Sequence, residues 1–271
     1  MNILVTLDSN YVGPLTVFLK SLMITNPNNE FDLYVAHSSL TEEDFIKIKN
    51  ATVPSRTRIH SIVVSPGILA DAPVFKRITN ETYYRLLMMD YLPESVDRVL
   101  YIDPDTVVLR DISPLYNIDF KGKTIAAAGH TKLFIEDINH IRFRTGRDSR
   151  YFNAGVMMVN LEKMRKNVTS QMVFDYVKKN KRWLFVADQD VLNGMFGNDM
   201  IPIDECLYNL DEKTIIYNPR TVKGVKWVEE NTVIVHFNGK YKPWKEGYKG
   251  KLAHLWFRFK DAELPVETNE A

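Results

Sequence analysis

The sequence is short of the features that mark secreted, disulfide-bonded or membrane-spanning proteins. It contains one cysteine, Cys206, so no disulfide can form within the chain, as is usual in a reducing compartment. No stretch approaches the roughly 18 consecutive apolar residues of a membrane-spanning helix. Residues 1–8 (MNILVTLD) also lack the basic segment that opens a signal peptide. We therefore expect a cytoplasmic protein.

A bias in charge is missing as well. Lys and Arg number 35 against 34 Asp and Glu, a formal net charge of +1, so no overall field attracts nucleic acid and we expect no nucleic-acid partner. Hydrophobic residues are 45% and charged residues 25% of the 271 residues, a globular balance that excludes disordered and coiled-coil chains. Neither a repeat nor a linker rich in Gly, Pro or Ser is present. We expect one domain over 1–244, followed by an extension over 245–271.

The first half of the chain alternates between two kinds of hydrophobic pattern. Short apolar runs predict strands at 3–7, 31–36, 59–64 and 99–102, and helical spacing or capping predicts helices at 15–23, after Thr41 and at 79–91. Strands separated by helices imply crossover connections and a mostly parallel sheet, hence an α/β, Rossmann-like fold. In such sheets ligands bind beyond the carboxyl ends of the strands. Asp8 and Asp103 both follow such ends.

The second half is less regular. The pattern predicts strands at 124–129, 152–160 and 232–237, and helices at 161–179 and 188–196. The extension interleaves basic and aromatic residues between Lys245 and Lys260. Such a segment can form a helix that lies on an anionic membrane surface, which would place the protein at the inner face of the membrane. The alternative is a C-terminal helix that packs its aromatic side chains on the domain.

Two carboxylates follow the strand at 99–102. Asp103 and Asp105 point to the same side of an extended chain, with backbones roughly 6–7 Å apart. Pro104 between them lacks an N–H and ends the strand. Carboxylates this close repel each other unless a cation lies beside them, and oxygen ligands suit magnesium or manganese. The alternative is a solvated acidic turn.

The run 103–108 (DPDTVV) also matches the start of haloacid-dehalogenase-type phosphatases. Those enzymes complete their magnesium site with a later GDxxxD or DD pair. Neither GD nor DD occurs in this sequence, so we exclude that class.

The wider sequence resembles glycosyltransferase family 8, the retaining nucleotide-sugar transferases that include bacterial lipooligosaccharide galactosyltransferases and glycogenin. The resemblance begins with residues 82–87 (TYYRLL) and 99–108 (VLYIDPDTVV). Four more segments also resemble the family: 6–11 (TLDSNY), 151–156 (YFNAGV), 187–190 (ADQD) and 236–244 (HFNGKYKPW). All of these segments occur along the chain in the order that the family has them. The resemblance implies a single GT-A-type domain and a UDP-sugar donor.

The resemblance also implies roles for individual residues. Asp103, Asp105 and His236 would bind the metal, and a set with one imidazole favours manganese over the alternative, magnesium. The donor would contact Thr6, Asp8, Asn10, Tyr11, Arg85, Asp103, Pro104, Asp105, Asn153, Asp188, Gln189, His236, Gly239 and Lys242. The residue types leave alternatives open: Arg85 can form a structural ion pair, Asp188 can cap the helix that it opens, and Lys242 can be solvated.

The implied reaction moves glucose or galactose from a UDP-sugar to a hydroxyl of a glycan, glycolipid or glycoprotein, with retention of configuration. Gln189 would lie near the anomeric carbon, opposite the leaving group. Because an amide is a poor nucleophile, we expect attack on the same face, with Asp188 as the alternative nucleophile. The acid that often follows the family's Ala-rich strand is missing, since His130 follows Gly129.

Two other functions are weighed against this transferase. A non-catalytic sugar-nucleotide or glycan-binding module would share the fold, and intact metal and lysine motifs argue against it. A nucleotidyltransferase would need a glycine-rich basic loop near the start, whereas residues 6–13 contain one glycine and no basic residue.

The basic segment 134–150 is expected to be either a lid over the donor or a surface loop.

Overall fold

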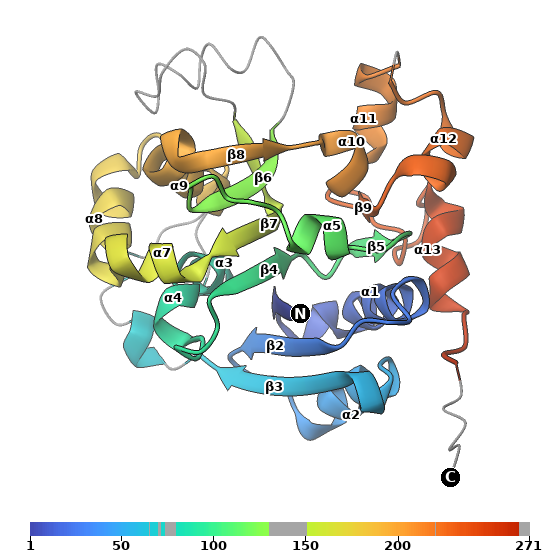
Figure 1. The fold of residues 1–271 in the computed structure, drawn as a ribbon, viewed down its shortest axis with the longest axis horizontal. Coiled ribbons are helices and arrows are strands. Elements are labelled where there is room, and N and C mark those ends of the chain that lie inside the picture. Colours follow the sequence, from blue (N-terminus) through green and yellow to red (C-terminus); the bar gives the residue numbers. More distant parts are fainter. Residues whose placement is uncertain (65, 70–71, 74–79, 130–150, 220, 266–271) are drawn as a thin grey trace.

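The computed structural model describes residues 1–64, 66–69, 72–73, 80–129, 151–219 and 221–265. Its centre is a seven-stranded sheet in the order β3-β2-β1-β4-β7-β6-β8 (Figure 1). The strands are β1 (Asn2–Thr6), β2 (Phe31–His37), β3 (Thr57–Val63), β4 (Arg98–Ile102), β6 (Ile125–Gly129), β7 (Phe152–Asn160) and β8 (Met200–Ile203). β7 runs antiparallel to β4 and β6, and all other neighbours are parallel. The expected mostly parallel sheet is confirmed.

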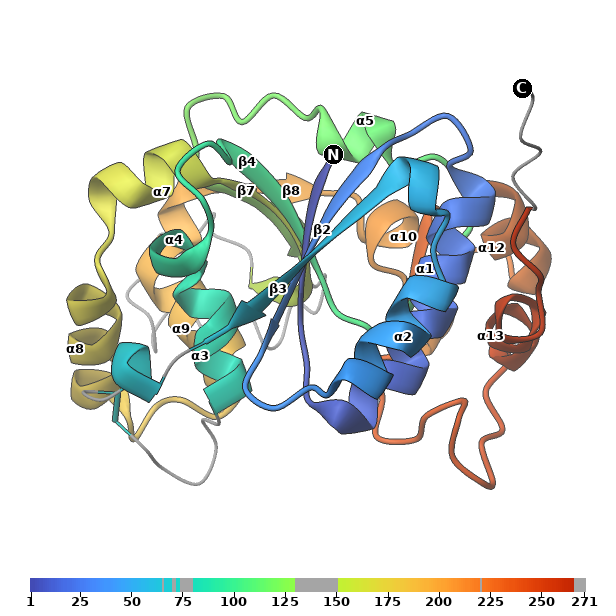
Figure 2. The same ribbon diagram turned by 90° about the horizontal axis from the view of Figure 1, so that it is seen from below.

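Helices cover both faces of this sheet (Figure 2). On one side lie α3 (Asn80–Leu86), α4 (Met88–Tyr91), α7 (Leu161–Asn167), α8 (Ser170–Asn180) and α9 (Ala187–Phe196), and on the other α1 (Val12–Thr25) and α2 (Glu42–Asn50). Side chains along β1 alternate between the two cores. Leu4 joins the cluster under α3 and α9, whereas Ile3 and Val5 join the cluster under α1.

A second, two-stranded sheet lies beside the first. It consists of β5 (Thr106–Val108) and β9 (Ile234–His236), which pair antiparallel. The remaining α-helices of the described residues are α5 (Ser113–Tyr116), α10 (Glu205–Tyr208), α11 (Glu212–Tyr217), α12 (Val225–Asn231) and α13 (Ala253–Lys260). The sequence pattern predicted the strand at β9, because that strand lies in a longer apolar run at 232–237. It did not predict β5, whose three residues directly follow the turn formed by residues 103–105.

Two predicted helices are divided in the structure. The helix expected at 79–91 is interrupted at Leu87, between α3 and α4. The helix expected at 161–179 breaks at Val168, which is extended, and the side chain of Thr169 then accepts a hydrogen bond from the backbone N–H of Met172 to begin α8. The helix after Thr41 has the predicted cap, with reciprocal hydrogen bonds between Thr41 and Asp44.

The C-terminal helix α13 packs on the domain against α1 and β5. Its Leu255, Trp256 and Phe259 are each about 1% exposed and belong to a third hydrophobic cluster, whereas Phe257 is 40% exposed. Most of the apolar side chains in this helix are therefore buried in the protein, and contact with a membrane stays a prediction. No helix within the described ranges is long and apolar enough to cross a bilayer.

Candidate functional site

The two aspartates lie where β4 ends. The backbone N–H of Asp103 donates to the carbonyl of Gly155 on β7 at 2.8 Å, which holds the turn against the sheet. After Pro104 the chain enters β5, whose register with β9 pairs Thr106 with His236. This pairing carries the imidazole across to the aspartates. The sequence prediction that these three residues meet is supported by the geometry.

The Asp103, Asp105 and His236 side chains form a compact group. Nε2 of His236 lies 3.1 Å from Oδ1 of Asp105 and 3.6 Å from Oδ2 of Asp103, and the candidate ligand atoms lie within 4.8 Å of one another. Asp105 is 5% exposed and His236 is 3% exposed. Two carboxylates and one imidazole facing a common point are a ligand set that suits manganese or magnesium.

The charges in this group depend on each other. Burial tends to raise the pKa of Asp105, but His236 and Lys242 outweigh it and lower that pKa to about 2. Burial dominates at Asp103, whose pKa is raised despite the nearby Arg85 and His236. Burial opposes charging of His236, yet the two carboxylates raise the pKa of its imidazole.

Arg85 joins two carboxylates from different segments. Its guanidinium lies 3.1 Å from Oδ1 of Asp103 and 2.8 Å from Oδ2 of Asp188, and 4.8 Å from the ring centre of Tyr101. The structural ion pair weighed for Arg85 is thus present. The alternative role of Asp188 as a helix cap is wrong, because the cap position of α9 is Val186 and no side chain caps it.

A cavity of about 320 Å³ opens beside the aspartates. It is lined by Thr6, Leu7, Asp8, Tyr11, Arg85, Asp103, Pro104 and Asp105. Asn10 does not line it. Instead, the backbone N–H and the amide of Asn10 donate to the Asp8 carboxylate at 2.9 and 3.2 Å, which fixes the loop after β1. Polar residues predicted from three separate motifs therefore share one cavity at the carboxyl edge of the sheet.

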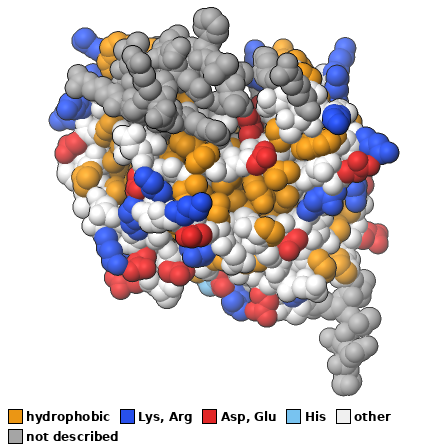
Figure 3. Space-filling model, turned by 45° about the horizontal axis from the view of Figure 1, so that its top comes forward, with side chains coloured by type: hydrophobic (Ala, Val, Ile, Leu, Met, Phe, Trp, Pro, Cys, Tyr) orange, Lys and Arg blue, Asp and Glu red, His pale blue; other side chains and the backbone are white. Residues whose placement is uncertain are grey.

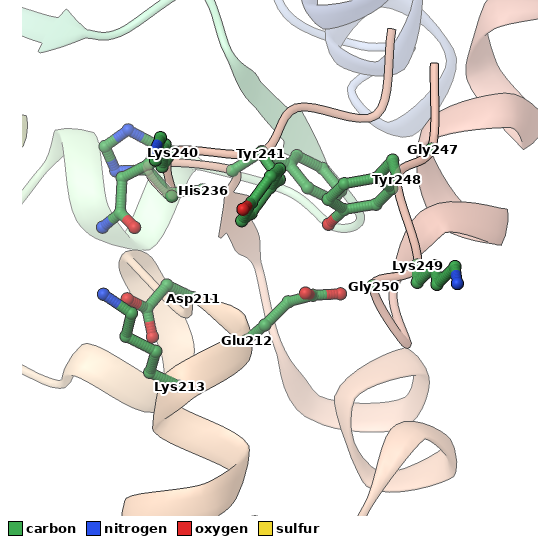
Figure 4. Close-up of a pocket in the computed structure, with 13 residues that line it drawn as sticks. Asp211, Glu212, Lys213, His236, Lys240, Tyr241, Gly247, Tyr248, Lys249 and Gly250 are labelled. Atoms are coloured by element: carbon green, nitrogen blue, oxygen red, sulfur yellow. The ribbon is translucent and has the colours of Figure 1, made fainter. Parts of the chain in front are cut away.

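A second cavity, of about 680 Å³, begins at His236 (Figure 4). Gly239 lines it, and the rings of Tyr241 and Tyr248 face Asp211 and Glu212 across it. These two acidic residues stand at the start of α11, where the side chain of Asp211 accepts from the N–H of Thr214.

Lys242 is turned toward the group of Asp103, Asp105 and His236. Its Nζ lies 2.6 Å from Oδ2 of Asp105 and donates to the carbonyl of Phe237 at 2.8 Å. The solvated alternative for Lys242 is therefore wrong: the side chain is 17% exposed and its ammonium pairs with a carboxylate.

Asn153 and Gln189 contact each other through their side-chain amides. The amide of Asn153 donates to Oε1 of Gln189 at 3.4 Å, and its oxygen accepts from the backbone N–H of Gly155 at 2.8 Å. Asn193 on α9 exchanges two hydrogen bonds with the backbone of Phe152, each at 2.7 Å, and so fixes α9 against β7. Gln189 and Asp188 are held at the edge of the sheet by this attachment.

Gly155 is a site residue that the sequence analysis did not single out. A Cβ built on it would collide with the imidazole of His236 and would lie 2.8 Å from Oδ2 of Asp103. Glycine alone therefore lets the imidazole rest against β7. The available signal was its place in segment 151–156. Two further residues missed by the sequence analysis are Tyr101, whose hydroxyl donates to Asp103 at 2.6 Å, and Asn209, which contacts His236.

Comparison with known proteins decides the family. The profile "Glycosyl transferase family 8" matches residues 2–247. The chain belongs to glycosyltransferase family 8. The expected resemblance is confirmed over almost the whole described domain.

Individual relatives and solved structures extend this comparison. The chain is 28% identical to General stress protein A of Bacillus subtilis, over 96% of this chain and 92% of that protein. It is 27% identical to a lipopolysaccharide 1,3-galactosyltransferase of Salmonella typhimurium, over 90% of this chain and 72% of that protein. The crystal structure of the galactosyltransferase LgtC with donor and acceptor sugar analogs matches with a TM-score of 0.81 and 26% identity, over 100% of this chain and 98% of that one. The GT-A fold is thereby confirmed.

A further solved structure of LgtC is an active-site mutant in which a glutamine is replaced by glutamate, with a TM-score of 0.80 and 25% identity to this chain, over 96% of this chain and 95% of that one. His130 and the basic segment 134–150 of this family 8 chain lie outside the described residues.

Proposed function

We propose that this family 8 protein transfers a hexose, glucose or galactose, from a UDP-sugar to a hydroxyl of a glycan acceptor, with manganese and with retention of configuration. The observation that carries the proposal is the group of Asp103, Asp105 and His236, whose two aspartates line the same cavity as Thr6 and Asp8 of the segment 6–11. The lipopolysaccharide enzymes among its relatives support a glycan acceptor.

The residues present suit a divalent cation. Asp103 and Asp105 offer carboxylate oxygens and His236 offers Nε2, and the three are already close together and largely buried. Buried acids that face each other need a positive charge between them, and only His236, Lys242 and Arg85 supply it within the described residues. When bound, the cation would neutralise the negative charge that develops on the departing UDP.

The protein adds fixed positive charge to the same place. Lys242 presents a compact ammonium beside Asp105, which suits one oxygen of a diphosphate. Gly239 follows at the edge of the second cavity, where the lack of a side chain permits a phosphate to approach the backbone. Charge placed before the reaction starts stabilises the transition state without reorganisation.

The surroundings of Asp188 favour attack on the same face of the sugar. Its Oδ2 lies 2.8 Å from Arg85. The carboxylate of Asp188 is therefore held in an ion pair, which makes it a weak nucleophile. Gln189 is an amide that accepts from Asn153. The existence of a glutamine-to-glutamate active-site mutant of LgtC supports a role for Gln189 in the site. We propose that the departing phosphate oxygen accepts the proton of the acceptor hydroxyl.

The described residues on the face shown in Figure 3 do not favour a nucleic-acid function. On the face in Figure 3, Lys and Arg side chains are interspersed with Asp and Glu rather than gathered in one patch. A broad field that attracts a polyanion requires charges of one sign to accumulate.

The test is a panel of UDP-sugars, assayed for UDP release and for transfer to glycan acceptors with and without Mn²⁺. We expect turnover with UDP-glucose or UDP-galactose only when the metal is present. Asp105→Asn should lose at least about 100-fold in kcat, because the metal contributes several kcal/mol to the barrier. Asp175→Asn, at an exposed position on α8, is the matched control and should leave kcat unchanged.

Binding of UDP-sugars without turnover, even with acceptors supplied, would instead identify a non-catalytic binding module. Gln189→Ala separates the roles within the site. A fall in kcat of about 100-fold is expected if the amide stabilises the transition state, and near-normal kcat would remove Gln189 from the mechanism.

A further inference from the structure

Asn209 is a buried polar residue placed directly behind the metal-binding imidazole. It ends the short helix α10 and begins a segment that runs along β9, where Leu210 donates to Ile234 at 3.1 Å and His236 donates to Leu210 at 2.8 Å through their backbones. The side chain of Asn209 is thereby aimed at His236 from the face opposite the aspartates. The residue is 2% exposed, so solvent does not satisfy its amide.

The amide oxygen of Asn209 lies 2.8 Å from Nδ1 of His236. A carbonyl oxygen can only accept a hydrogen bond, so this contact keeps a proton on Nδ1. Nε2 then faces Asp105 and Asp103, either as a second N–H donor or with a free lone pair. With Nδ1 engaged by Asn209, Nε2 is the ring nitrogen that faces the two carboxylates and can bind a cation beside them.

The amide nitrogen of Asn209 also indicates a specific role for this residue. Its Nδ2 is buried and has no hydrogen-bond partner among the residues that the structure describes. An unpaired buried N–H₂ group is costly, and an apolar side chain of similar size would avoid that cost. The amide is therefore not explained by packing, and its one hydrogen bond goes to the imidazole.

We infer that Asn209 is a positioning residue, which fixes His236 in the Nδ1–H tautomer and orients Nε2 toward the divalent cation. The inference rests on the proposed metal-dependent function. Histidines that bind metals usually donate their other ring N–H to an oxygen, which sets both the tautomer and the ring orientation. Here that oxygen comes from a segment 27 residues before the histidine, attached to it through the backbone of β9.

The first experiment measures Mn²⁺ affinity directly, by the EPR signal of free Mn²⁺ during titration of the full chain in the presence of saturating UDP. Asn209→Leu keeps the volume and removes the acceptor, and we expect its Mn²⁺ affinity to fall about 10–100-fold. Asn209→Asp keeps an acceptor oxygen at the same place and should retain the wild-type affinity. Asn26→Leu is the matched control.

Asn26 is also a buried amide, 1% exposed, with its oxygen accepting from the N–H of Ile112 at 2.9 Å. It caps the far end of α1, about 20 Å along the helix from Tyr11. Asn26→Leu should lower the melting temperature without changing Mn²⁺ affinity. If Asn209→Leu behaves in the same way, Asn209 is merely structural and the inference is wrong.

A second measurement needs no variant. In wild-type protein labelled with ¹⁵N-histidine and loaded with UDP and diamagnetic Mg²⁺, the His236 ring should show a protonated Nδ1 and an unprotonated Nε2. A proton on Nε2 in the loaded protein would overturn the inference. The two hypotheses also fail differently: wild-type protein that does not bind a divalent cation contradicts the proposed function, whereas wild-type binding that Asn209→Leu leaves unchanged contradicts only the role of Asn209.

Discussion

Nε2 of His236 lies 3.1 Å from Oδ1 of Asp105, although 131 residues separate the two in the chain. The antiparallel pairing of β5 with β9 brings them together, because Thr106 and His236 are direct partners in that register. The backbone N–H of Phe237 also donates to the carbonyl of Asp105 at 2.9 Å. The candidate metal site is therefore assembled by a two-stranded sheet that lies outside the main sheet, and disturbing either short strand should open it.

The close contact of His236 with Gly155 yields the first prediction. Gly155→Ala should displace the imidazole or Asp103, because the added Cβ has no space. We expect Mn²⁺ affinity to fall about 10–100-fold, measured by titration with UDP present. Gly13→Ala, on an exposed turn of α1 where a Cβ meets nothing within 4 Å, is the matched control and should bind Mn²⁺ normally. Normal affinity in Gly155→Ala would show that the site can relax around the methyl group.

Arg85 is expected to stabilise the fold as well as the site. Arg85→Met leaves Asp103 and Asp188 without their shared cation, and breaking a buried pair in this way costs about 3–5 kcal/mol of unfolding free energy. Arg85→Lys should lose less, because one ammonium can still reach one carboxylate. Urea unfolding at pH 7 measures both variants. A methionine variant as stable as wild type would mean that the carboxylates take up protons or water instead.

The pair of Asp32 and Arg58 predicts a dependence of stability on pH away from the site. Arg58 donates two hydrogen bonds to Asp32 at 2.7 and 2.8 Å, and this pairing, with His60, lowers the pKa of Asp32 to about 2. A carboxyl whose pKa is lower in the folded state stabilises the fold above its unfolded pKa of about 3.9. That contribution disappears as the pH falls toward 2.

The variant Arg58→Met should therefore unfold at a lower urea concentration than wild type at pH 7. The difference between the two midpoints should shrink between pH 4 and pH 2.5. A difference that stays constant over this range would assign the effect of Arg58 to packing rather than to the charge of Asp32.

The C-terminal helix should contribute to global stability through Trp256. This side chain is 1% exposed and its ring lies 4.9 Å from that of Trp244 and 5.4 Å from that of Phe237. Trp256→Ala should cost about 3–5 kcal/mol of unfolding free energy, as expected for removal of a large buried ring. The neighbouring Phe257→Ala should stay within about 0.5 kcal/mol of wild type. Equal effects at the two positions would contradict the packing of α13 seen here.

Membrane contact by the same helix has a separate test. Phe257 is exposed, and Nζ of Lys260 lies 5.6 Å from its ring centre, so an aromatic and a basic group reach the surface together. Phe257→Ser should weaken cosedimentation with phosphatidylglycerol vesicles several-fold if this surface binds anionic lipid. Ile46→Ser, at an apolar position on α2 that is 56% exposed, should have no effect. Absence of vesicle binding by the wild-type chain would end the membrane hypothesis.

Much of this protein could be predicted from local sequence. Short apolar runs mark six of the seven strands of the main sheet, all except the four-residue β8 at its edge. A carboxylate pair after the run at 99–102 marks the ligand-binding edge of the sheet. These features are local because a strand is defined by its own side chains and by the residue that stops it. The order of the motifs then indicated the family, which the comparisons confirm.

The tertiary structure alone decided how the site is held. The pattern predicted the strand at 232–237 but not its partner β5, and only the register between β5 and β9 brings His236 to Asp105. The pairing of Arg85 with Asp188, the space that Gly155 leaves for the imidazole and the hydrogen bond from His236 to Asn209 all join segments distant in the chain. No local pattern encodes such contacts, because they depend on strand register and on which helices pack against which face of the sheet.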